Sequence, residues 1–234
     1  MGGFHWKTLV FYGILTLLTL IAIILIITVN SQTKFAVEEV TIQADVILDA
    51  GHGGMDGGAV SADGICEAPI TLAIAQKTQY LMGFCGKNAL MTRTNDTSLH
   101  YREGATVGEN KNADLKARLE LSRQYPACPF LSIHLNQFPQ PQYAGAQVFY
   151  GPNGQRLAET LQAALKAALD PENERICKPA PDVVFLMKNI SSPAVIIECG
   201  FLSNPEECAK LQQDSYQTRI ALAIVSGFEN YNRG

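Results

Sequence analysis

The sequence predicts an α/β fold: a single domain with a central, mostly parallel, twisted sheet flanked by helices, preceded by one N-terminal transmembrane helix. Three observations support this fold class. From residue 44 onward, short apolar runs alternate with longer helical patterns, which is typical of α/β layers. Several of these runs end on a histidine or an acidic residue. The first segment of the chain, by contrast, is continuously apolar and long enough to cross a bilayer.

The N-terminal segment has no charged residue from Thr8 to Thr33, and Leu9–Val29 is almost wholly apolar. At about 1.5 Å per residue, this stretch spans roughly 30 Å of hydrocarbon. A cleavable signal peptide is the alternative, but its apolar region is usually about 7–15 residues and ends at small residues, which TVNSQTKF lacks. We therefore expect a cytoplasmic tip at 1–7, a transmembrane anchor or uncleaved signal at 8–30, a linker at 31–43 and a folded domain at 44–234.

The charge distribution and the cysteine content bear on where the domain lies, on nucleic-acid binding and on the state of the thiols. Lys7 precedes the apolar segment, whereas Lys34 is soon offset by Glu38 and Glu39, which favours export of the domain. The net charge is −4 and no basic cluster occurs, so we expect no nucleic-acid partner. Six cysteines without a CxxC pair fit buried thiols, with one disulfide as the alternative.

The expected elements follow from the apolar runs and their boundaries. Pro69 and Pro205 occupy positions where a first-turn proline is tolerated, and each marks a helix start. The polar segment Asn95–Asn112 is a long loop that either rims a groove or is simply flexible. The expected strands are Asp45–Asp49, Ala89–Thr92, Phe130–His134, Ala146–Tyr150, Val183–Met187 and Ala194–Cys199. The expected helices are Ile70–Met82, Leu115–Gln124, Gln155–Ala168, Glu206–Gln212 and Tyr216–Tyr231.

Three of the expected strands end on a residue suited to metal binding or acid–base chemistry. VILDAGH ends at His52, FLSIH at His134 and AVIIE at Glu198. Glu67 stands just before the helix that Pro69 opens. In open α/β sheets, functional groups gather where the strands end at their carboxyl edge. These four side chains are therefore the candidate site.

Each of these residues also has a structural explanation. His52 beside glycines fits a plain turn, and GHGG without a following Lys and Ser/Thr is a poor phosphate loop. His134 fits a hydrogen-bonded core histidine, and Glu67 fits a solvated first-turn acid. Glu198 is harder to explain structurally, because a carboxylate after Ala-Val-Ile-Ile costs heavily to bury without a partner, water or metal.

Taken together, the residues make chemical sense. Two neutral imidazoles and one carboxylate form a three-ligand zinc set that leaves a fourth position open. Zinc in such a site activates water and polarises a carbonyl. The chemistry also needs a general base that is not a ligand, and Glu198 is available for it. Cys199 alternates to the opposite face of its strand, so we expect it in the core, and Cys66 is interpreted in the same way.

The sequence resembles zinc-dependent N-acetylmuramoyl-L-alanine amidases over essentially the whole exported domain. The motifs VILDAGHGGMDGGAV, GICEAPITLAIA, ALMTRTND, LKARLELS, FLSIHLN, GAQVFY and AVIIECGFLSNPEE occur in the order found in that family. The HLN form of the second histidine motif, the GAQVFY strand and the single N-terminal anchor resemble the CwlD-type spore-cortex amidases in particular.

The resemblance implies roles for individual residues. It implies that His52, Glu67 and His134 hold one zinc ion per chain, that Glu198 is the catalytic glutamate, and that Asn136 contacts the substrate. The implied substrate is the amide between the lactyl group of N-acetylmuramic acid and L-alanine in peptidoglycan. In the spore subtype, removing the stem peptide precedes formation of muramic-δ-lactam, which marks the cortex for germination enzymes.

The resemblance also implies where the enzyme acts and with what. It implies a single-pass protein of a bacterial membrane, held by the N-terminal helix, with an amidase catalytic domain at 44–234 on the extracytoplasmic side. Clostridial members of the subtype need a lipoprotein partner, so the resemblance also implies an activating lipoprotein for this chain. Some amidases of the family carry a helical insertion that plugs the zinc, and here only Gln137–Ala144 occupies that place.

The sequence has three other interpretations. A membrane-anchored, non-catalytic peptidoglycan-binding module would keep a groove but not all four site residues, and all four are present. A zinc peptidase that cuts within the stem peptide commonly has an HxxE or HExxH pair, and neither spacing occurs around His52 or His134. The anchor could also serve only for export and leave a soluble enzyme.

Overall fold

The computed structural model of the protein describes residues 4–35 and 43–234, which belong to two units, 1–43 and 44–234. The first unit contains the helix α1 (Phe4–Phe35), whose segment His5–Thr28 is long and apolar enough to cross a membrane. α1 extends past both ends of the expected membrane segment, and no proline occurs between residues 4 and 35 to end it earlier. Residues 36–42 of the expected linker lie outside the described part of the chain.

The second unit is built on a six-stranded sheet with the strand order β2-β1-β3-β6-β4-β5. The pairs β1–β2, β1–β3, β3–β6 and β4–β5 are parallel, and β4 runs antiparallel to β6. The predicted α/β fold with a mostly parallel sheet is therefore confirmed. The strands are β1 (Val46–Ala50), β2 (Ala89–Met91), β3 (Phe130–Asn136), β4 (Gln147–Tyr150), β5 (Lys178–Pro179) and β6 (Ala194–Phe201).

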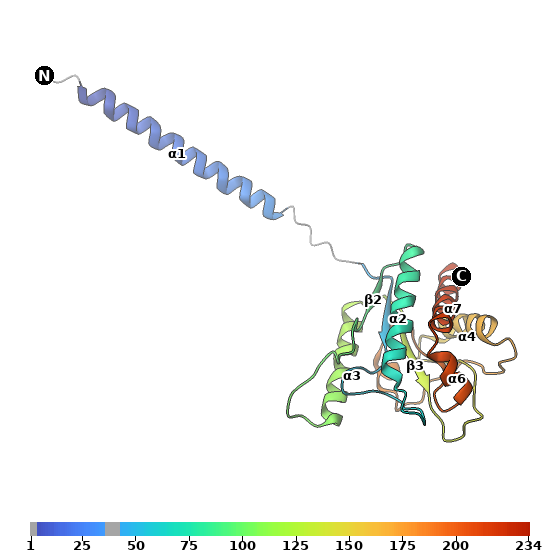
Figure 1. Ribbon diagram of the computed structural model, residues 1–234. Helices are drawn as coiled ribbons and strands as arrows, with labels where there is room; N and C mark the ends of the chain where they lie inside the picture. The colour runs from blue at the N-terminus through green and yellow to red at the C-terminus, as the bar shows by residue number, and fades with distance from the viewer. Residues whose placement is uncertain (1–3, 36–42) are drawn as a thin grey trace. The chain divides into compact units, whose positions relative to one another are not determined.

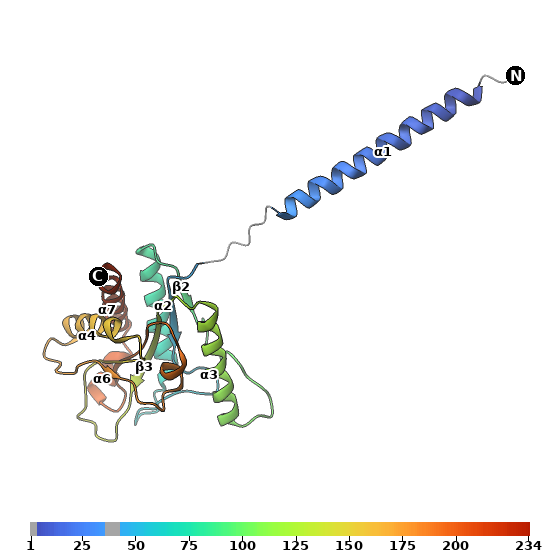
Figure 2. The ribbon, with the colours of Figure 1, turned by 180° about the vertical axis from the view of Figure 1, so that it is seen from behind.

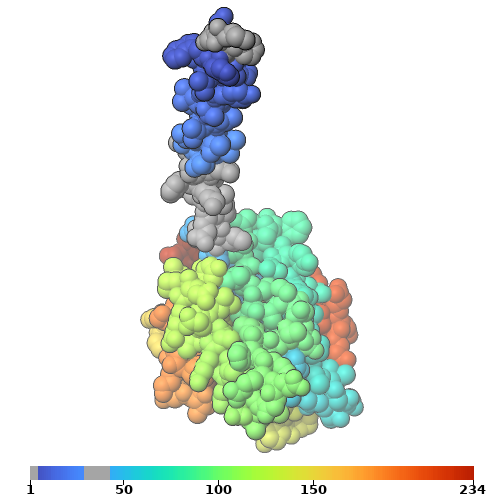
Figure 3. Space-filling view, turned by 90° about the vertical axis from the view of Figure 1, so that its left-hand side faces the viewer, coloured from blue at the N-terminus to red at the C-terminus, as the bar shows by residue number. Residues whose placement is uncertain are grey.

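Helices cover both faces of this sheet (Figure 1, and from behind in Figure 2). α2, α4 and α7 pack on one another along one face, and α3 and α5 pack on the other. α3 and the segment before it are seen from the outside in Figure 3, in green. The helices of this unit are α2 (Glu67–Phe84), α3 (Val107–Gln124), α4 (Gln155–Leu169), α5 (Phe185–Asn189), α6 (Pro205–Leu211) and α7 (Asp214–Arg233).

The alternation of side chains along the strands divides the core into two layers. In β1, Val46 and Leu48 join the apolar cluster under α2, α4 and α7. Ile47 joins the second cluster, with Leu119 of α3 and Leu186 of α5. Cys199 of β6 belongs to the first cluster and is buried, as expected from its alternation with Glu198. All six cysteines are free thiols.

Three expectations about the elements need correction. The predicted strand Val183–Met187 is wrong: Phe185–Asn189 is the helix α5. Consecutive Leu186 and Met187 are both buried while Val183 is 89% exposed, a pattern that a strand with one buried face does not produce. β5 was not predicted, since two residues that include a proline give no strand signal. The expected loop Asn95–Asn112 ends earlier, because a capping box between Thr106 and Glu109 starts α3 at Val107.

β1 is buried along its whole length, although it contains a carboxylate. Asp49 is 1% exposed and accepts hydrogen bonds from the guanidinium of Arg118, from Ser132 Oγ at 2.5 Å and from Thr92 Oγ1 at 2.8 Å. Burial alone would raise the pKa of Asp49, but Arg118 and the two hydroxyl groups outweigh it and hold that pKa below its usual range. Asp49 is therefore ionised and paired inside the sheet.

Replacing Asp49 by alanine should lower the free energy of unfolding by about 3–5 kcal/mol, because it leaves the buried Arg118 guanidinium without its counter-charge. Urea unfolding of the two proteins measures the difference. The control is Asp214→Ala, which removes an 85% exposed partner of Lys77 and should cost less than about 1 kcal/mol. Equal losses in the two variants would contradict the importance of the buried pair. Because folding lowers the pKa of Asp49, its contribution is lost as the pH falls through that lowered value.

Candidate active site

The candidate residues meet at the carboxyl edge of the parallel strands. His52 lies two residues beyond the end of β1, and Glu67 is the first residue of α2. His134 lies in β3 and Glu198 in β6, where the two are register partners on adjacent parallel strands. The topology thus brings residues from four segments of the chain to one place.

His52, Glu67 and His134 form a compact cluster whose potential ligand atoms all lie within 4.8 Å of one another. Glu67 is 2% exposed and lies between the two imidazoles. Its Oε1 is 2.9 Å from His134 Nδ1 and its Oε2 is 3.2 Å from His52 Nε2. The backbone N–H groups of Leu135 and Ala59 each donate to one of these oxygens, both at 2.8 Å. The carboxylate is therefore held in one orientation by the backbone.

The electrostatics of the cluster favour positive charge. Burial opposes protonation of His52, yet the carboxylates of Asp56 and Glu67 outweigh it and raise the pKa of His52 to about 9. Burial likewise opposes ionisation of Glu67, but the two imidazoles hold its pKa well below the usual range. Two imidazole nitrogens and one carboxylate oxygen are also the donor set of an open zinc site. The residues present therefore fit a divalent metal ion.

Glu198 lies beside this cluster without belonging to it. Its Oε2 is buried and has no hydrogen-bond partner among the described residues. Burial, the largest cause, raises the pKa of Glu198 to about 7, with the imidazole of His134 acting in the opposite direction. A carboxyl group with a pKa near neutrality can both accept and return a proton, which is the property of a general base and acid.

Comparison with known proteins agrees with this arrangement. The family model described as N-acetylmuramoyl-L-alanine amidase, of the Amidase_3 type, matches residues 46–230. The chain belongs to this family. It is 34% identical to the germination-specific N-acetylmuramoyl-L-alanine amidase of Bacillus subtilis (strain 168), over 80% of this chain and 78% of the relative. The family's enzymes hydrolyse the amide between N-acetylmuramic acid and L-alanine in peptidoglycan.

Two solved structures resemble the fold of this amidase. The CwlD amidase from Clostridioides difficile, solved in complex with the GerS lipoprotein, has a TM-score of 0.77 and 41% identity, covering 80% of this chain and 98% of that one. The N-acetylmuramoyl-L-alanine amidase AmiC2 of Nostoc punctiforme has a TM-score of 0.70 and 27% identity, covering 82% and 98%. The sequence resemblance to amidases, and to the CwlD type in particular, is thereby confirmed.

Asn136 stands two residues beyond His134 at the end of β3. Its Oδ1 accepts a hydrogen bond from the backbone N–H of Gln137 at 2.8 Å, and in the sheet register it pairs with Phe201 of β6. This position is on the same edge as the rest of the site. Its contact with substrate stays a prediction.

Three residues that support the site were not singled out from the sequence. Asp56 lies four residues after His52, and its Oδ2 is 2.8 Å from His52 Nδ1 and 3.3 Å from Lys111 Nζ. The aspartate of the GHGGMD stretch was an available signal. The other two are the buried arginines Arg93 and Arg118, which bond to the backbone around His52. No local sequence pattern predicts such contacts, because they join residues about 40 and 70 positions apart.

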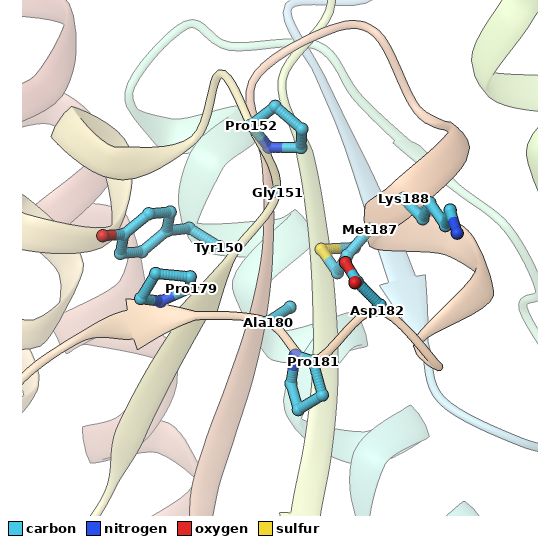
Figure 4. A pocket seen from close by; sticks show the side chains of 9 residues that line it. All are labelled: Tyr150, Gly151, Pro152, Pro179, Ala180, Pro181, Asp182, Met187 and Lys188. Atoms are coloured by element: carbon cyan, nitrogen blue, oxygen red, sulfur yellow. The ribbon is translucent and has the colours of Figure 1, made fainter.

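The amidase has a larger cavity away from this site. It measures about 220 Å³ and is lined by residues 150–152 at the end of β4 and by residues 179–182, 187 and 188 (Figure 4). Tyr150, one of its residues, pairs with Val195 near the start of β6, whereas Glu198 lies further toward the other end of that strand. A smaller cavity of about 50 Å³ is lined by His52, His134, Asp56 and Lys111, among others. Of these two cavities, the one of about 50 Å³ adjoins the His–Glu–His cluster.

Replacing Asp56 by alanine should weaken the binding of a divalent metal about 10- to 100-fold, because His52 loses the carboxylate that orients its ring. Titration of Zn²⁺ into the metal-free protein in competition with a chromogenic chelator measures the affinity. Asp63→Ala is the matched control, since it removes an exposed acidic group from the same segment. Equal weakening in both variants would indicate a general charge effect and contradict the orienting role of Asp56.

Proposed function

We propose that this amidase is a zinc-dependent enzyme that removes stem peptides from spore-cortex peptidoglycan. In this proposal His52, Glu67 and His134 hold one zinc ion and Glu198 is the catalytic glutamate. The observation that carries it is the compact His–Glu–His cluster beside a carboxyl group whose buried oxygen has no partner among the described residues. The donor set and the neighbouring acid–base group together meet the needs of amide hydrolysis.

In the proposed hydrolysis, the metal ion and the side chains of the protein have different roles. Zinc, when bound, lowers the pKa of water and polarises the lactyl carbonyl of the substrate. Glu198 accepts the proton of the attacking water and later delivers it to the leaving amine of L-alanine. The alternative, a non-catalytic binding module, does not explain why a complete set of acid–base and ligand groups is assembled here.

The spore role is supported by the named relatives. The Bacillus subtilis relative is germination-specific, and the CwlD structure comes from Clostridioides difficile. We infer that stem-peptide removal by this enzyme precedes the formation of muramic-δ-lactam in the cortex. The apolar segment His5–Thr28 supports single-pass anchoring, with the catalytic domain on the extracytoplasmic side, where peptidoglycan lies.

The first test uses the full chain in detergent, loaded with zinc and incubated with purified peptidoglycan. Mass spectrometry should detect free peptides that begin at L-alanine, and a chelator should abolish them. Glu198→Ala should reduce turnover by about 10²–10⁴-fold while zinc remains bound, because the residue is not a ligand. His134→Ala should lose both zinc and turnover. Loss of zinc from the Glu198 variant would assign this residue a different role.

A second test concerns a partner protein. Because the CwlD amidase was solved with the GerS lipoprotein, we infer that this chain also acts with a lipoprotein. Turnover of the full chain is measured alone and with the corresponding lipoprotein of its source added in equimolar amount. A several-fold rise is the expected outcome, with an unrelated lipoprotein as control. Equal turnover under all three conditions, together with no co-elution in gel filtration, would contradict the partnership.

A further inference from the structure

The segment between β3 and β4 lies directly beside the active site and is firmly attached. We call residues 137–145 the aromatic loop. The backbone N–H of Phe138 donates to Ser203 Oγ at 3.0 Å, and the Pro141 carbonyl accepts from Asn204 Nδ2 at 2.9 Å. At its end, the Gly145 N–H donates to Glu207 Oε1 at 3.0 Å. The short loop is thus bonded along its length to the segment that follows β6.

The aromatic loop presents two rings to solvent on a rigid base. Phe138 is 48% exposed and Tyr143 is 40% exposed, and their ring centroids are 5.2 Å apart in an edge-to-face arrangement. Both rings lie beside Phe201, at 6.3 and 6.4 Å, and Phe201 is itself 1% exposed. Arg175 covers Phe201 at 4.6 Å from the ring centroid. Ring–ring contacts of this kind fix the orientation of the two exposed rings.

The position of these rings relative to the reacting group follows from the sheet register. His134 pairs with Glu198, and Asn136 pairs with Phe201. At about 3.3 Å per residue, Phe201 lies roughly 7–10 Å beyond Glu198 along β6. The rings that rest on Phe201 are therefore within reach of a substrate whose amide lies at Glu198.

Charged side chains are found on both sides of the active site, and the exposed aromatic rings lie on one of them. On the side of α3, Lys111, Asp56 and Asp114 line the small cavity beside His52. On the aromatic side, the guanidinium of Arg175 is already bonded to the Ala144 carbonyl at 2.6 Å and to Gln147 Oε1 at 3.1 Å. The cavity of about 570 Å³ next to Tyr143 is lined by three acidic side chains, Asp170, Glu172 and Glu174, and by two basic ones, Arg175 and Lys178.

The substrate of the proposed function has two chemically different parts. Its stem peptide carries carboxylate and amine groups, whereas its glycan chain is built of sugars with apolar C–H faces. We propose that Phe138 and Tyr143 form a platform on which the glycan sugar next to the reacting muramyl residue stacks. The partly positive C–H groups of a sugar face are attracted to the negative face of an aromatic ring. The stem peptide then extends toward the side of α3, away from the rings. The proposal rests on the proposed function and adds the orientation of its substrate.

The test compares two soluble substrates with the zinc-loaded full chain. One is a glycan oligosaccharide that carries stem peptides, and the other is a single muramyl residue with the same peptide. The double variant Phe138→Ala/Tyr143→Ala should raise KM for the oligosaccharide by about tenfold, with kcat nearly unchanged. KM for the monosaccharide should stay the same, since it lacks the neighbouring sugar. Tyr143→Phe retains the ring and should behave like the parent protein.

A matched control is available on α2. Tyr80 and Phe84 are 72% and 89% exposed, and they lie 13 and 17 residues into a helix that begins at the site, or roughly 20–26 Å away. The variant Tyr80→Ala/Phe84→Ala should leave both KM values unchanged. The zinc content of all variants should match that of the parent, because none of the four rings belongs to the proposed ligand set.

A binding measurement keeps this inference separate from the proposed function. In a Glu198→Gln background, the platform variant should co-sediment with insoluble peptidoglycan about tenfold more weakly than the control variant. If the parent enzyme releases no peptides, the proposed function fails, while sedimentation still decides the platform. Unchanged sedimentation, or a KM shift that is equal for both substrates, would overturn the assignment. So would loss of lipoprotein binding with unchanged KM, since the rings would then belong to a protein interface.

Discussion

The active site depends on how the chain leaves the buried strand β1. After β1 the chain turns inside the domain, and the carbonyl groups of Ala50, Gly51 and His52 are withdrawn from solvent. Each of them needs a hydrogen-bond donor, because an unsatisfied buried carbonyl costs about 1–3 kcal/mol. Arg93 donates to Ala50 at 3.0 Å and to Gly51 at 2.9 Å. Arg118 donates to Ala50 at 2.9 Å and to His52 at 2.7 Å. A guanidinium group suits this task because its donors form a rigid fork.

The same two side chains connect the turn to the rest of the site. Arg93 also donates to the carbonyl of Ala68 at 2.8 Å, next to Glu67 at the start of α2. The charge of Arg118 is balanced by Asp49 within β1. His52 and Glu67 are therefore tied to a common framework and cannot shift independently. Because that framework contains buried charges, the stability of the fold and the geometry of the site rest on the same contacts.

The strands and site residues that depend on a local sequence pattern could be predicted from the sequence. The runs that precede His134 and Glu198 are almost wholly apolar, which identifies buried parallel strands, and an ionisable residue at the end of such a run is conspicuous. The short run Val183–Met187 was misassigned because five apolar residues do not distinguish a strand from a helix. Arg93 and Arg118 escaped notice because their partners lie far away in sequence, and only the assembled tertiary structure shows that they are buried.

The geometry of the His52 turn also explains its glycines. A Cβ atom on Gly51 would lie 2.4 Å from His134 Cε1, and one on Gly58, where φ is +72°, would lie 2.6 Å from Glu67 Oε2. These glycines allow the backbone to approach the side chains of His134 and Glu67 closely, so they serve packing. His52 itself has φ of 61°, a conformation that costs on the order of 1–3 kcal/mol and persists only where its surroundings enforce it. Asp56 holds its ring and Arg118 holds its carbonyl. An ion that binds here therefore meets an imidazole already oriented by the protein.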